Sequence, residues 1–404
     1  MNNLETLGIG YCFDLVNISP NLFRLKNLKE LDLSCNYLLF ENNDFIACSV
    51  YSNDKASTQN ASDDENNNDY TNFVSYKSLK ILYIGNNDLS EFPQNFLNFI
   101  NLEEINISGN LFEDIPLVIH SFVNLKILDI SSNYIEEVII KNNMFNNLLE
   151  LYLEYNRIIK LSISDNALQN LETFNLSYNN FSKLDRNIFQ LKRLKNLSVF
   201  GVIFTEIEKF PYVRDDPMNL ILTLKDISVL SNIFCYNGIH ELTVRCEEQI
   251  DGEIDIFEHV PFNAQIKYLE FYKCFLTSIS PGISKLINLE VLKASDNEII
   301  ILENVFTGMT SLKSLDLSFN RITNIDGNIF DIITLEELNL FFNRIKLLPS
   351  NINNMRNSNL QIDLCMNPLH LGIDADSQNL ELIHIEQVNR DILGNIIYDR
   401  ISTP

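Results

Sequence analysis

Hydrophobic residues recur in a unit of 23 residues whose centre alternates between apolar and polar positions. Five copies run from Leu79 to Phe181, each an LxxLxLxxNxL line, with their asparagines at Asn87, Asn110, Asn133, Asn156 and Asn179. In the middle of each line the two apolar side chains point one way and the polar residues between them point the other way. Each unit therefore predicts one short strand with a single apolar face.

Such a unit cannot bury its apolar pair alone, so the units are expected to stack with their strands in one parallel sheet. The asparagine follows the strand where the chain turns inward. Its amide can both donate and accept, which suits the N–H and C=O groups of a buried turn. We therefore predict that these asparagines form a structural ladder, and that loss of one costs about 1–3 kcal/mol.

The repeated line resembles the leucine-rich repeat family. The 23-residue spacing, with proline six residues after the asparagine at Pro93, Pro116 and Pro349, is similar to the intracellular subclass of Ras-suppressor and SHOC-like scaffolds. The resemblance implies an α/β solenoid curved like a horseshoe. Its parallel β-sheet would line the concave face, and short helical or irregular segments would lie on the convex side.

The same template extends in both directions and predicts about 15 repeats over residues 1–369. A polar, low-complexity stretch at about 42–72 separates two of them and is predicted to be a disordered insert. Repeats at about 200–262 are irregular. One of their lines is placed on Leu222 and Leu224 with Ile227 in the asparagine position, and Phe210 to Pro217 is expected to form an irregular loop. The apolar spacing over 370–404 predicts a C-terminal helical cap.

The net charge is -24, with a pI near 4.5, which opposes binding to nucleic acid or to anionic membrane surfaces. This charge has two interpretations, the solubility of a long surface or the attraction of a basic partner. No signal peptide is recognised at the N-terminus and no apolar run is long enough to span a membrane. The seven cysteines contain no CxxC pair and are expected to be reduced. Together these features predict a cytoplasmic protein, although several NxS sequons favour the opposite.

Candidate chemistry is sparse. The five histidines are scattered, and the sequence has no HExxH, GxxxxGK[ST] or GxSxG motif. We therefore predict no enzymatic activity, no cofactor and no metal site.

The predicted concave face consists of the residues two, four and six positions before each asparagine. Aromatic side chains on rigid strands offer contact area at small entropic cost and are enriched at interaction hot spots. The candidate partner-binding residues are the aromatic and acidic ones at or beside these positions: Tyr83, Glu150, Tyr152, Glu154, Tyr155, Phe200, Tyr268, Glu270, Tyr272, Phe341 and Phe342. For any single aromatic residue, an ordinary surface position is an equal alternative.

These features predict a non-enzymatic scaffold or adaptor that binds a partner protein on its concave face, and one interpretation of the charge makes that partner basic. By resemblance, the role would be in signalling, through a small GTPase or through phosphatase regulation. Two alternatives stay open. One is an extracellular receptor or adhesin, and the other is the recognition subunit of an enzyme complex whose catalytic chain is separate. The oligomeric state is left open.

Overall fold

A computed structural model describes residues 3–369, apart from 14, 17, 19–21, 23–24, 39–76, 93–95, 98, 205–206, 208–212, 236, 250–255, 258–259, 261–263, 303, 326, 350–351 and 353–359. The predicted insert at 42–72 and the predicted cap at 370–404 lie outside the described residues. The chain divides into two compact units, Met1–Val202 and Ile203–Pro404. The single solenoid domain predicted over 1–369 stays a prediction.

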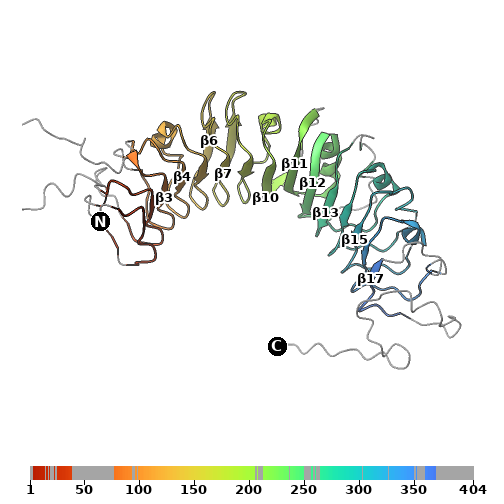
Figure 1. Cartoon of the computed structure of the whole chain (residues 1–404). Coiled ribbons are helices and arrows are strands. Elements are labelled where there is room, and N and C mark those ends of the chain that lie inside the picture. Colours follow the sequence, from red (N-terminus) through yellow and green to blue (C-terminus); the bar gives the residue numbers. More distant parts are fainter. Residues whose placement is uncertain are drawn as a thin grey trace, which may run out of the picture. The chain divides into compact units, whose positions relative to one another are not determined.

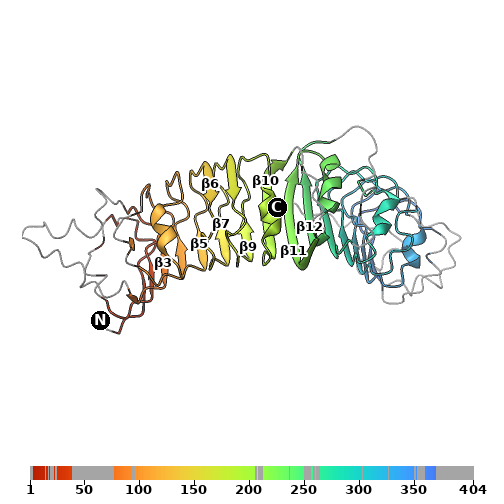
Figure 2. The same cartoon turned by 90° about the horizontal axis from the view of Figure 1, so that it is seen from above.

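The first unit is built on parallel strands that follow one another in chain order (Figures 1 and 2). These strands are β1 (Thr6–Gly8), β2 (Glu30–Asp32), β3 (Ile81–Tyr83), β4 (Glu104–Asn106), β5 (Ile127–Asp129), β7 (Glu150–Tyr152), β9 (Thr173–Asn175) and β10 (Asn196–Phe204). From β2 to β9 the middle residue of each strand is buried and its two neighbours are half-buried. The predicted alternation therefore describes these strands correctly.

From β3 onward the segments between the strands of the first unit are short. Their described residues include the 3₁₀ helices η6 (Leu117–Ser121) and η7 (Arg186–Gln190) and a separate two-stranded parallel sheet of β6 (Glu137–Ile140) and β8 (Lys160–Ile163). In Figure 1, β6 lies on the side of the unit away from the main strands. The side chains that each turn buries, such as Val118 and Ile119 of η6, close the core from that side.

The second unit repeats this design. Its strands are β11 (Val213–Leu224), β12 (Asn237–Cys246), β13 (Tyr268–Tyr272), β14 (Val291–Lys293), β15 (Ser314–Asp316), β16 (Glu337–Asn339) and β17 (Gln361–Asp363), and its 3₁₀ helices are η8 (Ile227–Cys235), η9 (Pro281–Lys285) and η10 (Gly327–Asp331). Both units are thus solenoids of parallel strands with short helical or irregular connections, which confirms the predicted fold class.

Two details of the irregular repeats differ from the sequence prediction. Leu220 pairs with Leu242 and Leu222 with Val244, so the line lies two residues earlier than predicted, on Leu220 and Leu222 instead of Leu222 and Leu224. Lys225 therefore takes the asparagine position, not Ile227. Three alternating leucines allow two frames, and the pairing with β12 selects one.

The predicted loop from Phe210 to Pro217 is also wrong over its described part, because residues 213–217 belong to β11. The pairing of β11 with β12 shifts register between Val213 and Met218 and again between Met218 and Asn219. Proline has no backbone N–H to give to a ladder. Pro217 is accommodated because the strand is irregular at that point.

The asparagine ladder connects each 23-residue repeat to its neighbour, as Asn133 shows. Its Nδ2 donates to the carbonyl oxygens of Ile107 and Ile130 at 3.1 and 3.2 Å, and its Oδ1 accepts from the N–H of Phe112 at 3.0 Å. Asn133 is 5% exposed. Equivalent bonds surround Asn87, Asn110, Asn156, Asn179, Asn297, Asn320 and Asn343. The predicted structural role of these residues is confirmed.

A second row, seven residues before the ladder asparagines, carries mainly charged side chains, which alternate in sign from Lys80 to Lys126 and from Lys267 to Glu336. Glu103 accepts from Lys80 and from Lys126, both at 2.6 Å, and Glu290 pairs with Lys267 at 3.6 Å and Lys313 at 2.6 Å. Further pairs are Lys29 with Glu5 and Lys195 with Glu172. We call this the charge row. Each pair joins one 23-residue repeat to the next on the exposed surface.

Candidate functional site

The side chains two, four and six residues before each ladder position lie on one side of the sheet, which we call the strand face. In the first unit this face carries six carboxylates. They belong to Glu30, Asp32, Glu104, Asp129, Glu150 and Glu154. All positions of the strand face from β1 to β10 are described, and none of them is Lys, Arg or His. The first unit therefore presents a surface of one sign.

Strand β7 and its continuation hold three of the predicted residues. The hydroxyl of Tyr152 donates to Oε2 of Glu150 at 2.6 Å. Burial raises the pKa of Tyr152 to about 12, and the hydrogen bond and charge of Glu150 add to this effect. The phenol is thus a fixed hydrogen-bond donor near neutral pH, and it holds the Glu150 carboxylate in one orientation.

Glu154 is half-buried and lies at the end of the same strand face. Burial raises the pKa of its carboxyl group, and the charge of Asp129 on the neighbouring strand adds to the rise against a backbone hydrogen bond that lowers it. Its Oε2 is shielded from solvent and has no hydrogen-bond partner among the described residues.

An exposed group of aromatic rings lies beside these carboxylates. Tyr155 stacks on Tyr178 with ring centroids 4.4 Å apart and planes inclined by 8°, and Tyr178 meets Phe200 edge-on at 5.6 Å. Tyr155 is 55% exposed and Tyr178 41%. We call Tyr155, Tyr178 and Phe200 the aromatic cluster. Two of its members were predicted, and the structure joins them through Tyr178, which the sequence prediction missed.

The backbone of the aromatic cluster is unusual. Tyr155 and Tyr178 immediately precede ladder asparagines and have φ of 55° and 54°, in the left-handed region that bulky residues avoid. Gly109 and Ser132 occupy the same position in earlier repeats, so the fold itself does not require an aromatic residue there. The sequence signal for Tyr178 was therefore its position directly before the asparagine, which is the position that the predicted residues Tyr155 and Phe342 also occupy.

Gly201 occupies the next place in that column. It has φ of 73°, and a Cβ at this residue would lie 2.6 Å from Cδ1 of Tyr178. Other residues adopt a positive φ at the same position of neighbouring repeats, so glycine is favoured here mainly for the space that the Tyr178 ring takes.

Tyr83 lies apart from the aromatic cluster. Its hydroxyl donates to Oε1 of Glu104 at 2.7 Å, and burial together with this bond raises its pKa. β4 and β5 separate it from Tyr152, which corresponds to roughly 14 Å at the usual strand spacing. Tyr83 and Tyr152 thus share a face but do not form one compact patch.

The predicted residues of the second unit form two groups. On β13 the hydroxyl of Tyr268 donates to Glu270 at 2.6 Å. Lys293 lies over the Tyr268 ring at 5.4 Å, and Lys273 lies over the Tyr272 ring at 5.2 Å. These tyrosines therefore already have cations of the same chain against their rings.

The other group is apolar. Phe341 and Phe342 contact Phe319, with ring centroids 5.2 and 5.4 Å from it. Phe319 and Phe342 precede ladder asparagines, like Tyr155 and Tyr178, and both are exposed. The second unit thus repeats the aromatic column, and the strand face around it carries Asp316, Glu337 and Asp363.

The described residues contain no cluster of His, Cys, Asp or Glu side chains arranged to hold a metal ion. In the same part of the chain, no helix has both the length and the apolar character needed to cross a membrane. No disulfide joins Cys12, Cys35, Cys246, Cys274 or Cys365.

Comparison with known proteins agrees with the architecture. Family models described as leucine rich repeat match residues 265–322 and 170–191. No curated protein matches the sequence at a significant level.

Similar solved structures include a leucine-rich repeat protein of Leptospira interrogans, with 21% identity, a TM-score of 0.58, and coverage of 94% of this chain and 93% of that one. The structure of TLR13 with ssRNA13 is 19% identical, with a TM-score of 0.59, and the match covers 92% of this chain but 48% of TLR13. Toll, in the Drosophila Toll–Spatzle complex, is 19% identical over 91% of this chain and 43% of its own, with a TM-score of 0.54. At these identities the similarity concerns the fold alone. The repeated line, the parallel strands that it forms and the two matching family models identify this chain as a leucine-rich repeat protein.

Proposed function

We propose that this protein is a non-enzymatic interaction module that binds a basic segment of a partner protein on the strand face of its first unit. Leucine-rich repeat solenoids typically serve protein–protein interaction, and their stacked units create extended binding surfaces. The observation that carries the proposal is the row of six carboxylates without a cation, next to the exposed aromatic cluster.

The electrostatic argument rests on spacing. Neighbouring strands lie about 4.8 Å apart, within the screening length of about 8 Å at physiological ionic strength. The carboxylates of adjacent strands, such as Asp129 and Glu154, therefore repel one another, and this contributes to the raised pKa of Glu154. A basic segment would relieve this repulsion and would be attracted to the face at a rate that falls with added salt.

The aromatic cluster supplies the second half of the site. A Lys or Arg side chain over an exposed tyrosine ring contributes about 0.5–1 kcal/mol, and about 2 kcal/mol once water is excluded. Tyr155 and Tyr178 are stacked and backed by Gly201, so little rotamer freedom is lost when a partner covers them. In the second unit, Lys273 and Lys293 already take the corresponding places, which makes the Tyr268 and Tyr272 patch the weaker candidate.

An intracellular signalling role, through a small GTPase or phosphatase regulation, is an extension that rests on the resemblance to Ras-pathway scaffolds. The extracellular alternative requires glycans at sequons such as Asn106. The Nδ2 of Asn106, the atom that a glycan would modify, donates to Asp129 at 2.8 Å on the strand face. This bond supports the intracellular proposal, and a glycosidase shift assay on protein from its native cell separates the two.

The proposed function is tested with a fluorescein-labelled deca-lysine peptide, whose binding is followed by anisotropy at several salt concentrations. Glu150→Gln with Glu154→Gln should weaken binding about tenfold, or about 1.4 kcal/mol. The matched control is Glu113→Gln with Asp114→Asn, which makes the same charge change at two exposed residues off the strand face. Tyr155→Ser with Tyr178→Ser should also weaken binding, whereas Phe319→Ser with Phe342→Ser should not. Equal losses in the Glu150/Glu154 variant and its control would refute the site.

A further inference from the structure

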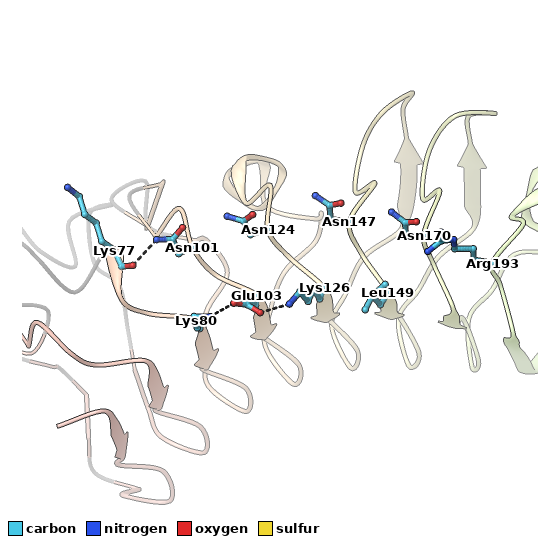
Figure 3. Close-up of a pocket in the computed structure, with 10 residues that line it drawn as sticks. All are labelled: Lys77, Lys80, Asn101, Glu103, Asn124, Lys126, Asn147, Leu149, Asn170 and Arg193. Atoms are coloured by element: carbon cyan, nitrogen blue, oxygen red, sulfur yellow. Dashed lines mark hydrogen bonds and ion pairs between the residues drawn. The ribbon is translucent and has the colours of Figure 1, made fainter. Parts of the chain in front are cut away.

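A second surface of the first unit has the opposite charge. A groove with a volume of about 520 Å³ runs along the residues that precede β3, β4, β5, β7, β9 and β10 (Figure 3). One wall is a row of amides, nine residues before the ladder asparagines: Asn101, Asn124, Asn147 and Asn170. The other wall is the charge row from Lys80 to Leu149. We call this the amide groove.

The amides of the groove are held in place and remain available for further bonds. The Nδ2 of Asn124 donates to the carbonyl of Ile100 at 3.1 Å, and that of Asn147 donates to the carbonyl of Val123 at 2.8 Å. The same bond joins Asn101 to Lys77 and Asn170 to Asn146. Each of these amides has a second N–H and a carbonyl oxygen, and the described residues provide no partner for the oxygen. The row therefore presents fixed donors and acceptors, one set per 23-residue repeat.

Cations predominate along the groove. Lys77, Lys80, Lys126 and Arg193 line it together with one carboxylate, that of Glu103. Lys126 and Lys80 bond to the two oxygens of Glu103, and these bonds lower its pKa, so its charge is already neutralised. Lys77 and Arg193 are exposed and form no ion pair with another described residue. Figure 3 shows these two at opposite ends of the amide row.

We infer that the amide groove binds an extended acidic segment of a partner protein. Carboxylates of such a segment would meet the lysines and Arg193, and its backbone N–H and C=O groups would meet the oxygens and free N–H groups of the asparagines. A nucleic-acid backbone offers mainly acceptors, so it would leave the amide oxygens unused. This inference is independent of the proposed function, since it concerns a different surface and a ligand of opposite charge.

The test uses labelled deca-glutamate as the probe, with anisotropy measured on the full chain. Lys77→Glu with Arg193→Glu should weaken its binding at least about tenfold, and Lys77→Gln with Arg193→Gln should weaken it less. Arg344→Glu with Lys346→Glu is the matched control, because it reverses the charge of two exposed residues in the second unit. Leu149→Glu is a further variant. It adds a carboxylate inside the groove without removing a side-chain hydrogen bond, and it should also weaken binding.

Circular dichroism of each variant confirms folding, and deca-lysine binding serves as an internal reference because the proposed function places it on the strand face. Loss of deca-glutamate binding with retained deca-lysine binding supports the amide groove. The inference is overturned if the groove and control variants lose deca-glutamate binding equally. It is also overturned if the wild-type protein binds a labelled decameric oligouridine as tightly as deca-glutamate, because the groove would then accept polyanions in general.

Discussion

Replacing Asn133 with alanine tests the ladder, because the structure indicates which groups lose their partners. The carbonyl of Ile107 also accepts from Asn110, that of Ile130 from Asn156, and that of Ser131 from the N–H of Gly109. All three carbonyls thus keep a donor in Asn133→Ala. The N–H of Phe112, which donates to Oδ1 of Asn133, is left without its acceptor.

A buried N–H without an acceptor costs about 1–3 kcal/mol, and the weakened bonds to three carbonyls add to this cost. Asn133→Ala should therefore lower the free energy of unfolding by about 2–3 kcal/mol. Urea unfolding measures the total. Hydrogen exchange should place the largest loss of protection at the N–H of Phe112, in the repeat before the mutated residue.

Asn124→Ala is the matched control. It removes the same amide from an exposed residue with one hydrogen bond, to the carbonyl of Ile100, and should cost less than about 1 kcal/mol. If Asn133→Ala loses as little unfolding free energy as this control, or if Phe112 stays protected, the assignment of the ladder as the main link between neighbouring repeats is refuted.

Four further outcomes are expected. Tyr152→Ala with Glu154→Lys should weaken binding of a basic partner by at least about 2 kcal/mol without altering the circular dichroism spectrum, and full affinity would move the site elsewhere. Gly201→Ala should lower stability by about 1–2 kcal/mol, since alanine is strained at a φ of 73° and its Cβ meets the Tyr178 ring; an unchanged near-ultraviolet tyrosine signal would contradict this. Because the folded-state pKa of Glu154 is raised above 4.5, its ionised form opposes folding at pH 7 and this opposition disappears as the pH falls; Glu154→Gln should stabilise the protein at pH 7 but not at pH 4, as measured by urea unfolding at both values. Deletion of residues 53–69 should lower Tm by less than about 5 °C, because their polar composition buries no core, and a larger fall in a thermal scan would show that the insert has a structural role.

The repeated line determined much of the architecture because its two signals are local. The alternation about Leu128 predicts both the strand and its buried side, and Asn133 predicts the turn that follows. In β11 the same signal is ambiguous, since Leu220, Leu222 and Leu224 alternate equally well in two frames. Pairing with β12 decides between the frames, and that information lies in another segment.

The candidate site was only partly predictable, for a related reason. Glu150 and Tyr152 follow from strand alternation. Tyr178 lies at a left-handed residue after the strand, where alternation no longer says which way a side chain points. The amide groove depends on Asn124 and Asn147, which occur outside the repeated line in a chain rich in asparagine. Their alignment becomes visible only once the repeats are stacked.

The charge row has a consequence for how the number of repeats can change. In the second unit, excision of the 23-residue repeat that contains Glu290 would bring Lys267 against Lys313, replacing two attractive contacts with one repulsive contact. Excision of two successive repeats, with Glu290 and Lys313, would bring Lys267 against Glu336 and restore opposite charges. Each exposed pair contributes only about 0.2–1 kcal/mol, yet the alternation repeats along the stack. Between Lys267 and Glu336, gain or loss of repeats in pairs is therefore favoured over single steps, a constraint on repeat number that the leucines and asparagines do not impose.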